Sequence, residues 1–185
     1  MERLIFRESY PLWFLFLLGY GVIWAYMILV NYQRGKPIEQ RELYEYHNEK
    51  IMKFAGTLPT AILFILSFFL EVQPGNLTWV GLVFFTAGII INIIALHSYS
   101  RLSEGINDSG IYRISRNPMY LGAFFFFAGL NLIAWTSSFM SYLFLFFTLI
   151  WMAVTHWMVL REEQFLEHKY GSAFSDYKNG VHRYI

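Results

Sequence analysis

The sequence contains no cysteine, which excludes disulfide bonds, thiolate metal sites and cysteine nucleophiles. Charged residues are also scarce, at 15% of the chain, whereas soluble domains carry about 25%. The formal net charge of +1 gives no basic excess of the kind that favours nucleic-acid binding. No group of residues has metal-ligand spacing. The chain is instead 56% hydrophobic and 21% aromatic, a composition typical of membrane proteins.

Long apolar runs divide the chain. A helix needs about 20 mostly apolar residues to cross the hydrocarbon core of a bilayer. Five segments meet or approach this requirement, namely 11–30, 51–70, 77–96, 119–135 and 139–160. The segment 119–135 is the shortest of them. The sequence therefore predicts an all-α integral membrane protein with about five transmembrane helices.

The distribution of lysine and arginine predicts how these helices are oriented. With five spans, the N-terminus and both short turns share one side of the membrane, which holds only Arg3 and Arg7. The other twelve of the 14 lysine and arginine residues lie in the two long connections and the C-terminal tail. The positive-inside rule then places the N-terminus outside and the long connections and the tail in the cytoplasm. We also expect a helix on the membrane surface at 34–50, and a tail that extends the last span and then folds back.

The most informative polar stretch is residues 110–122. Asn117 followed by Pro118 is a strong helix start, because asparagine caps free backbone amides and proline fits the first helical position. Two arginines and two tyrosines surround this start, namely Arg113, Arg116, Tyr112 and Tyr120. A helix N-terminus beside guanidinium groups suits an anionic ligand such as a carboxylate or phosphate. It equally suits an interfacial belt that contacts lipid phosphates, and the residues alone leave both interpretations open.

A second polar cluster, Arg161-Glu162-Glu163, follows the last apolar run. Acidic side chains near the C-terminal end of a helix oppose its dipole, so their presence calls for a reason. One reason is a cationic ligand. The other is pairing with Arg161, Arg113 or Arg116.

Two motifs carry a resemblance to a known superfamily. The first, from Gly110, reads Gly-x-Tyr-Arg-x-x-Arg-Asn-Pro-Met-Tyr-x-Gly. After a predicted helical hairpin, the second reads Glu-Glu-x-x-Leu-x-x-x-Tyr-Gly-x-x-Phe-x-x-Tyr from Glu162. Together they resemble the isoprenylcysteine carboxyl methyltransferase and phospholipid methyltransferase superfamily over about residues 97–183. The family usually has histidine where Asn117 stands, and asparagine keeps a hydrogen-bonding side chain but has no titratable group.

The resemblance implies a cytoplasmic pocket for S-adenosylmethionine, formed by the C-terminal half of the chain without a Rossmann sheet. It divides the chain into residues 1–96, with three spans and a cytoplasmic connection at 31–50, and a methyltransferase-like region at 97–185. The implied cofactor contacts are His97, Glu104, Gly105, Ile106, Asn107, Tyr112, Asn117, Pro118, Met119, Tyr120 and Glu162.

The implied activity is methyl transfer to a lipophilic acceptor, either a membrane lipid or a lipidated molecule. An isoprenylcysteine-type carboxylate would be oriented by Arg113 or Arg116. A phospholipid amine must first lose a proton, and Glu163 is then the expected catalytic acceptor of that proton. Two alternatives are an NADPH-dependent membrane reductase that resembles the sterol reductases, and a non-catalytic lipid-binding membrane protein.

Overall fold

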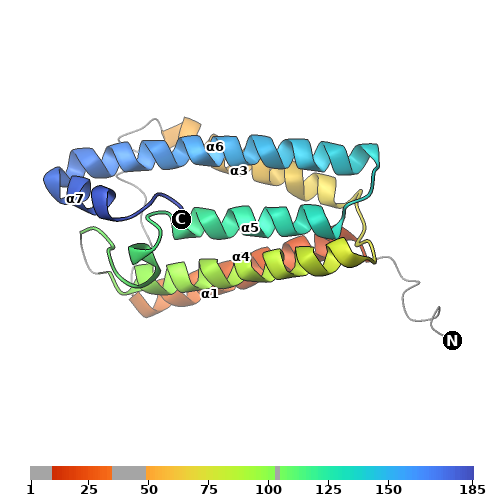
Figure 1. Ribbon diagram of the computed structural model, residues 1–185, viewed down its shortest axis with the longest axis horizontal. Helices are drawn as coiled ribbons and strands as arrows, with labels where there is room; N and C mark the ends of the chain where they lie inside the picture. Colours follow the sequence, from red (N-terminus) through yellow and green to blue (C-terminus); the bar gives the residue numbers. More distant parts are fainter. Residues whose placement is uncertain (1–9, 35–48, 103–104) are drawn as a thin grey trace.

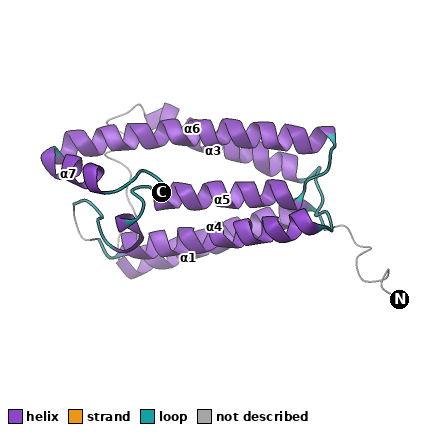
Figure 2. Cartoon of the chain, viewed as in Figure 1, coloured by secondary structure: helices purple, strands orange, loops and turns teal. Residues whose placement is uncertain are grey.

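The computed structural model describes residues 10–34, 49–102 and 105–185. Within these ranges the chain is helical, and its one β-type pairing is an isolated bridge between Pro11 and Glu71 (Figure 2). The elements are α1 (Leu12–Arg34), α3 (Glu49–Ser67), α4 (Asn76–Ser100), the 3-10 helix η1 (Gly110–Arg113), α5 (Pro118–Ile133), α6 (Phe139–Tyr170) and α7 (Ser172–Gly180). The all-α prediction is confirmed. The predicted surface helix at 34–50 lies outside the described residues, apart from its ends.

In the described part of the chain, four helices are long and apolar enough to cross a membrane, namely α1, α3, α4 and α6. This confirms the prediction of a multi-pass membrane protein. The apolar helix α5 has 16 residues. At about 1.5 Å per residue it falls short of a hydrocarbon core of about 30 Å. It nevertheless lies parallel to the other long helices (Figure 1), and a fifth span stays a prediction.

The long helices alternate in direction, so their connections gather at two ends of the bundle (Figure 1). At one end the start of α1 meets the turn after α3, where the Leu12 amide donates to the Leu70 carbonyl at 2.9 Å. At the other end lie η1, α7 and the C-terminal residues. There the Arg116 amide donates to the His182 carbonyl at 2.9 Å, which confirms that the tail folds back. We call this second end the polar end of the bundle.

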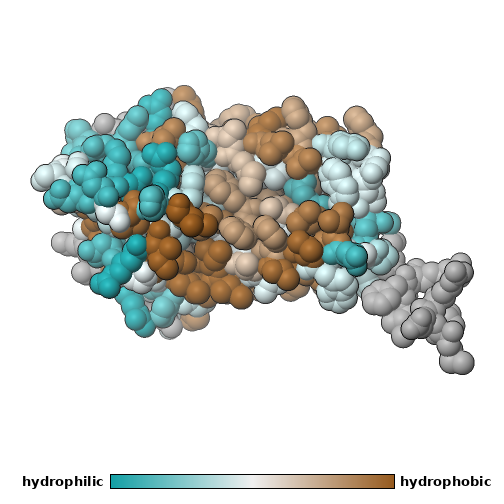
Figure 3. All heavy atoms as spheres, viewed as in Figure 1, coloured by the Kyte–Doolittle hydropathy of each residue, from teal (hydrophilic) through white to brown (hydrophobic). Residues whose placement is uncertain are grey.

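The outer surface of the bundle suits a lipid environment. Apolar side chains cover the middle of the visible face, between two more hydrophilic ends (Figure 3). Large apolar side chains are exposed on several helices, among them Phe54 at 63% and Trp79 at 68%. Exposed apolar patches of this extent are rare on soluble proteins and mark surfaces that contact a partner or a membrane.

Glycines hold α5 tightly against α4. Gly81 and Gly88 on α4 face Gly122 and Gly129 on α5, and the two glycines of each helix lie about two turns apart. A Cβ atom on Gly88 would lie 2.6 Å from the Gly122 carbonyl oxygen, and one on Gly129 would lie 2.7 Å from the Gly81 oxygen. Only small residues allow two helix backbones to approach this closely. Gly122 and Gly129 therefore permit the close packing of α5 on α4, and this packing fixes the start of α5.

Candidate functional site

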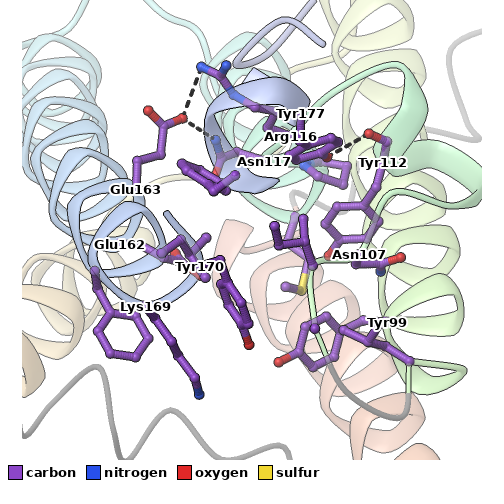
Figure 4. A pocket seen from close by; sticks show the side chains of 18 of the residues that line it. Tyr99, Asn107, Tyr112, Arg116, Asn117, Glu162, Glu163, Lys169, Tyr170 and Tyr177 are labelled. Atoms are coloured by element: carbon purple, nitrogen blue, oxygen red, sulfur yellow. Dashed lines mark hydrogen bonds and ion pairs between the residues drawn. The ribbon is translucent and has the colours of Figure 1, made fainter. Parts of the chain in front are cut away.

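A pocket lies at the polar end of the bundle. Its walls come from the end of α4 and the following loop, η1, the start of α5, the last turns of α6, and α7. Figure 4 shows side chains of α6 on one side, with Tyr99, Asn107 and Tyr112 across from them. The pocket brings together most of the predicted site residues, namely Gly105, Ile106, Asn107, Tyr112, Arg116, Asn117, Pro118, Met119, Tyr120, Glu162 and Glu163.

Three predicted site residues do not belong to this described lining. His97 is exposed, and its Nδ1 atom lies 2.9 Å from the Tyr26 hydroxyl of α1. Arg113 is also exposed, and its Nε donates to the Asp108 carbonyl at 3.4 Å. Glu104 lies outside the described residues.

The sequence prediction missed Tyr99, Leu102, Phe174 and Tyr177, and it also missed a group of lining residues on α6. Phe165, Leu166, Lys169 and Tyr170 line the pocket from α6. They follow Glu162 by three, four, seven and eight positions, and residues with this spacing share one face of a helix. Helical periodicity starting from Glu162 would therefore have identified them.

Three buried hydrogen-bond donors in the pocket wall have no partner within the described structure: the Asn107 Nδ2, the Tyr112 hydroxyl and the Arg116 Nε. The Asn107 side-chain oxygen, in contrast, accepts from the Ser109 hydroxyl at 3.0 Å. Burial raises the pKa of the Tyr112 phenol, and the nearby Glu162 carboxylate raises that pKa further, so the hydroxyl keeps its proton. A buried donor without an acceptor costs about 1–3 kcal/mol. Three of them in one pocket indicate positions where a ligand supplies the acceptors.

Glu163 is the centre of a buried ion-pair network. Its two oxygens accept from the Arg183 guanidinium, Nε to Oε1 at 3.1 Å and Nη2 to Oε2 at 2.8 Å. Arg116 Nη2 lies 3.3 Å from Oε1, and the side chains of Glu163 and Arg116 are only 6% and 8% exposed. Because two guanidinium groups share this one carboxylate, its charge is neutralised inside the protein.

The start of α5 corrects one expectation. The helix begins at Pro118, as predicted, but Asn117 makes no side-chain hydrogen bond to the helix start, so the predicted cap is wrong. The side-chain Nδ2 of Asn117 instead donates a hydrogen bond to Glu163 Oε1 at 3.1 Å (Figure 4). A hydrogen bond to an ionised acceptor is about twice as strong as one between neutral groups, which explains why the side chain turns toward Glu163.

Glu162 has different surroundings from its neighbour in sequence. It is partly exposed, and its Oε2 accepts from the Tyr120 hydroxyl of α5 at 2.9 Å. No lysine or arginine of the described chain forms an ion pair with it. The two acidic residues that are adjacent in the sequence therefore have different surroundings: Glu163 pairs with arginines, whereas Glu162 lines the pocket and accepts from Tyr120.

Comparison with known proteins identifies a matching family. A family profile described as phospholipid methyltransferase matches residues 76–173, just over half of the chain. No curated protein and no solved structure matches. The matched stretch begins at the first residue of α4 and ends within α7, so it contains nearly all of the residues that line the pocket.

Proposed function

The chain belongs to the phospholipid methyltransferase family, and from this premise we propose that it methylates the headgroup amine of a membrane phospholipid. Family members use S-adenosylmethionine, so the chain is a methyltransferase that depends on this cofactor. Membership leaves the reductase and the non-catalytic lipid-binding alternatives without support. The choice of an amine over a carboxylate acceptor is the proposal, and it rests on the charges around the pocket.

A carboxylate acceptor requires a positive charge that is free to orient it. Arg113 lies outside the pocket lining. Arg116 pairs with Glu163, and its Nη1 donates to the Lys178 carbonyl at 2.7 Å, so only its Nε has no partner within the described structure. Lys169 is the other cation among the described lining residues. It is exposed to solvent and lies over the Tyr170 ring, with 5.5 Å between its Nζ atom and the ring centroid. The pocket therefore offers a carboxylate acceptor little attraction.

An ammonium headgroup, in contrast, matches the charge that the pocket presents. No arginine of the described residues pairs with the Glu162 carboxyl group, and this is the observation that carries the proposal. Tyrosine rings from four elements line the same pocket, namely Tyr99, Tyr112, Tyr120 and Tyr170. Aromatic faces attract cations by about 0.5–2 kcal/mol each, depending on their exposure.

The pocket also fits the cofactor. When bound, S-adenosylmethionine supplies a methyl group on a positively charged sulfur. We propose that the Asn107 Nδ2 and the Tyr112 hydroxyl, both buried and without a partner among the described residues, donate hydrogen bonds to its polar groups. The start of α5 and the loop before η1 would form the rest of its binding surface.

We propose separate roles for the two glutamates. A protonated amine must lose a proton before it can act as a nucleophile, and Glu162 is placed to accept that proton. Glu163 was the residue expected for this step. Its oxygens already accept from Arg183 and Asn117, so we assign it to holding the pocket wall. From the positive-inside rule we also propose that the polar end of the bundle, and the site with it, faces the cytoplasm.

The acceptor assignment can be tested with two defined lipids. Purified protein in nanodiscs receives methyl-labelled S-adenosylmethionine together with phosphatidylethanolamine or with a farnesylated cysteine that has a free carboxylate. We expect label in the phospholipid and none above background in the carboxylate. Preferential labelling of the carboxylate would overturn the amine assignment and restore the isoprenylcysteine-type alternative.

The unpartnered hydroxyl of Tyr112 gives a prediction about cofactor binding. Tyr112→Phe should weaken binding of the demethylated cofactor by about two- to tenfold, the worth of one hydrogen bond. The thermal unfolding midpoint should not fall, because the hydroxyl has no partner in the described structure. Calorimetry and thermal unfolding in detergent measure the two effects. Tyr142→Phe, at an exposed tyrosine near the opposite end of α6, is the matched control. Unchanged affinity in Tyr112→Phe would show that this hydroxyl does not contact the cofactor.

A further inference from the structure

The residues after α7 form a strap across the polar end of the bundle. We use the name C-terminal strap for residues 181–184. Val181 is extended, with φ −132° and ψ 132°, and the chain then returns to the start of α5 (Figure 1). The strap lies beyond the stretch that matches the family, so family membership assigns it no role.

The strap holds the start of α5 through its backbone. The amides of Arg116 and Asn117 donate to the carbonyls of His182 and Arg183, at 2.9 and 3.2 Å. The Ser115 hydroxyl also donates to the Arg183 carbonyl, at 3.2 Å. These bonds fix the two residues that line the pocket just before Pro118.

The strap holds α6 through its side chains. The Arg183 guanidinium makes two nearly parallel hydrogen bonds to the Glu163 carboxylate, at 3.1 and 2.8 Å. One residue further, the Tyr184 hydroxyl lies 2.9 Å from His156 Nδ1 of α6. The Tyr184 ring also packs edge-on against Phe124 of α5, with 5.3 Å between ring centroids. The strap therefore joins α5 and α6, two helices that both contribute to the pocket wall.

Arg183 acts on the pocket indirectly, through Glu163. It does not line the pocket, whereas its partner Glu163 does, together with Arg116 and Asn117. Without Arg183, Glu163 would keep only the Arg116 contact and the Asn117 amide. A carboxylate with fewer partners is free to turn toward the pocket, where it would add a second negative charge beside Glu162.

We propose that Arg183 is a positioning residue for methyl transfer. By holding Glu163 against Arg116 and Asn117, it keeps this wall of the pocket in the geometry that binds the cofactor. It also leaves Glu162 as the one carboxyl group among the described lining residues that has no arginine partner. The inference rests on the proposed function of the pocket and adds a residue that touches neither cofactor nor acceptor.

A double-mutant cycle on cofactor binding tests the inference. Calorimetry in detergent measures the Kd of S-adenosylhomocysteine, the demethylated cofactor, for wild type, Arg183→Gln, Glu163→Gln and the double variant. We expect each single variant to weaken binding about tenfold, which corresponds to about 1.4 kcal/mol. The double variant should lose little more than either single variant, because coupled residues are not additive. A residue that only stabilises the fold would lower the unfolding midpoint without producing this pattern in Kd.

Lys178→Gln is the matched control. It removes a positive charge from the same C-terminal part of the chain. The Lys178 ammonium pairs with Glu167 at 3.3 Å, and both side chains are well exposed, at 39% and 46%. Exposed pairs of this kind contribute little, so binding of S-adenosylhomocysteine should stay unchanged.

The outcomes separate this inference from the proposed function. No binding by the wild type would overturn the proposed function and the inference with it. Binding by the wild type and by a folded Arg183→Gln variant with the same Kd would overturn the inference alone. Losses of binding affinity that multiply in the double variant would also overturn the inference alone. If Arg183→Gln does not fold, Glu163→Gln decides, and an unchanged Kd for that variant overturns the inference.

Discussion

Replacing Glu162 with glutamine should lower kcat for methylation of a phospholipid amine by about 10²–10⁴-fold, the usual contribution of a general base. Glutamine keeps the size of the side chain and can still accept from the Tyr120 hydroxyl. It cannot accept the proton that the acceptor amine must lose. Initial rates with phosphatidylethanolamine in nanodiscs, at saturating labelled cofactor, measure the effect.

The pH dependence of the methylation rate distinguishes a general-base role of Glu162 from a structural change in the pocket. As the pH rises, a growing fraction of the lipid amine is already deprotonated and needs no base. The rate of Glu162→Gln should therefore rise more steeply with pH than the rate of the wild type. Glu167→Gln, on the same helix and with an exposed ion pair, is the control and should keep full activity. A Glu162→Gln enzyme with normal kcat would show that another group, or bulk water, takes the proton.

Replacing Glu163 with leucine should lower the free energy of unfolding by about 3–5 kcal/mol, the cost of breaking a buried ion pair. The change leaves the guanidinium of Arg116, which is 8% exposed, without its carboxylate. Arg183 loses both of its hydrogen bonds to that carboxylate as well. Denaturant unfolding in detergent, followed by tryptophan fluorescence, measures the loss.

Two further variants make this stability prediction specific. Glu167→Leu breaks an exposed ion pair on the same helix and should cost about 0–1 kcal/mol. Adding Arg116→Met to Glu163→Leu should recover part of the lost stability, because the unpaired buried charge is then removed. Equal losses for Glu163→Leu and Glu167→Leu would show that the network around Glu163 contributes nothing beyond surface pairing.

The sequence predicted those features of the fold that depend on local patterns. Apolar runs located all of the long helices, because a helix in lipid needs a continuous apolar stretch. Proline at the first helical position located the start of α5 at Pro118. The missing cap shows the limit of local reasoning. Asn117 turns away from its own helix toward Glu163, which is 46 positions later in the chain, and no local rule includes that partner.

The site could be predicted only in part, for a similar reason. Arg113 and Arg116 are three positions apart and have the same chemistry in the sequence. The structure exposes the first and buries the second against Glu163. Neighbouring residues on a helix point about 100° apart, so Glu162 and Glu163 also have different partners. Arg183, which decides the partners of Glu163, belongs to neither sequence motif.

The most direct test of the central claim uses the lipids of a native membrane. Purified protein is incubated with methyl-labelled S-adenosylmethionine and a total lipid extract, and the labelled lipid is identified by mass spectrometry. The predicted product is a phospholipid that carries the label on its headgroup nitrogen and keeps it under mild alkaline treatment. Label that mild alkali releases as methanol would identify a methyl ester on a carboxylate, and that result would contradict the account.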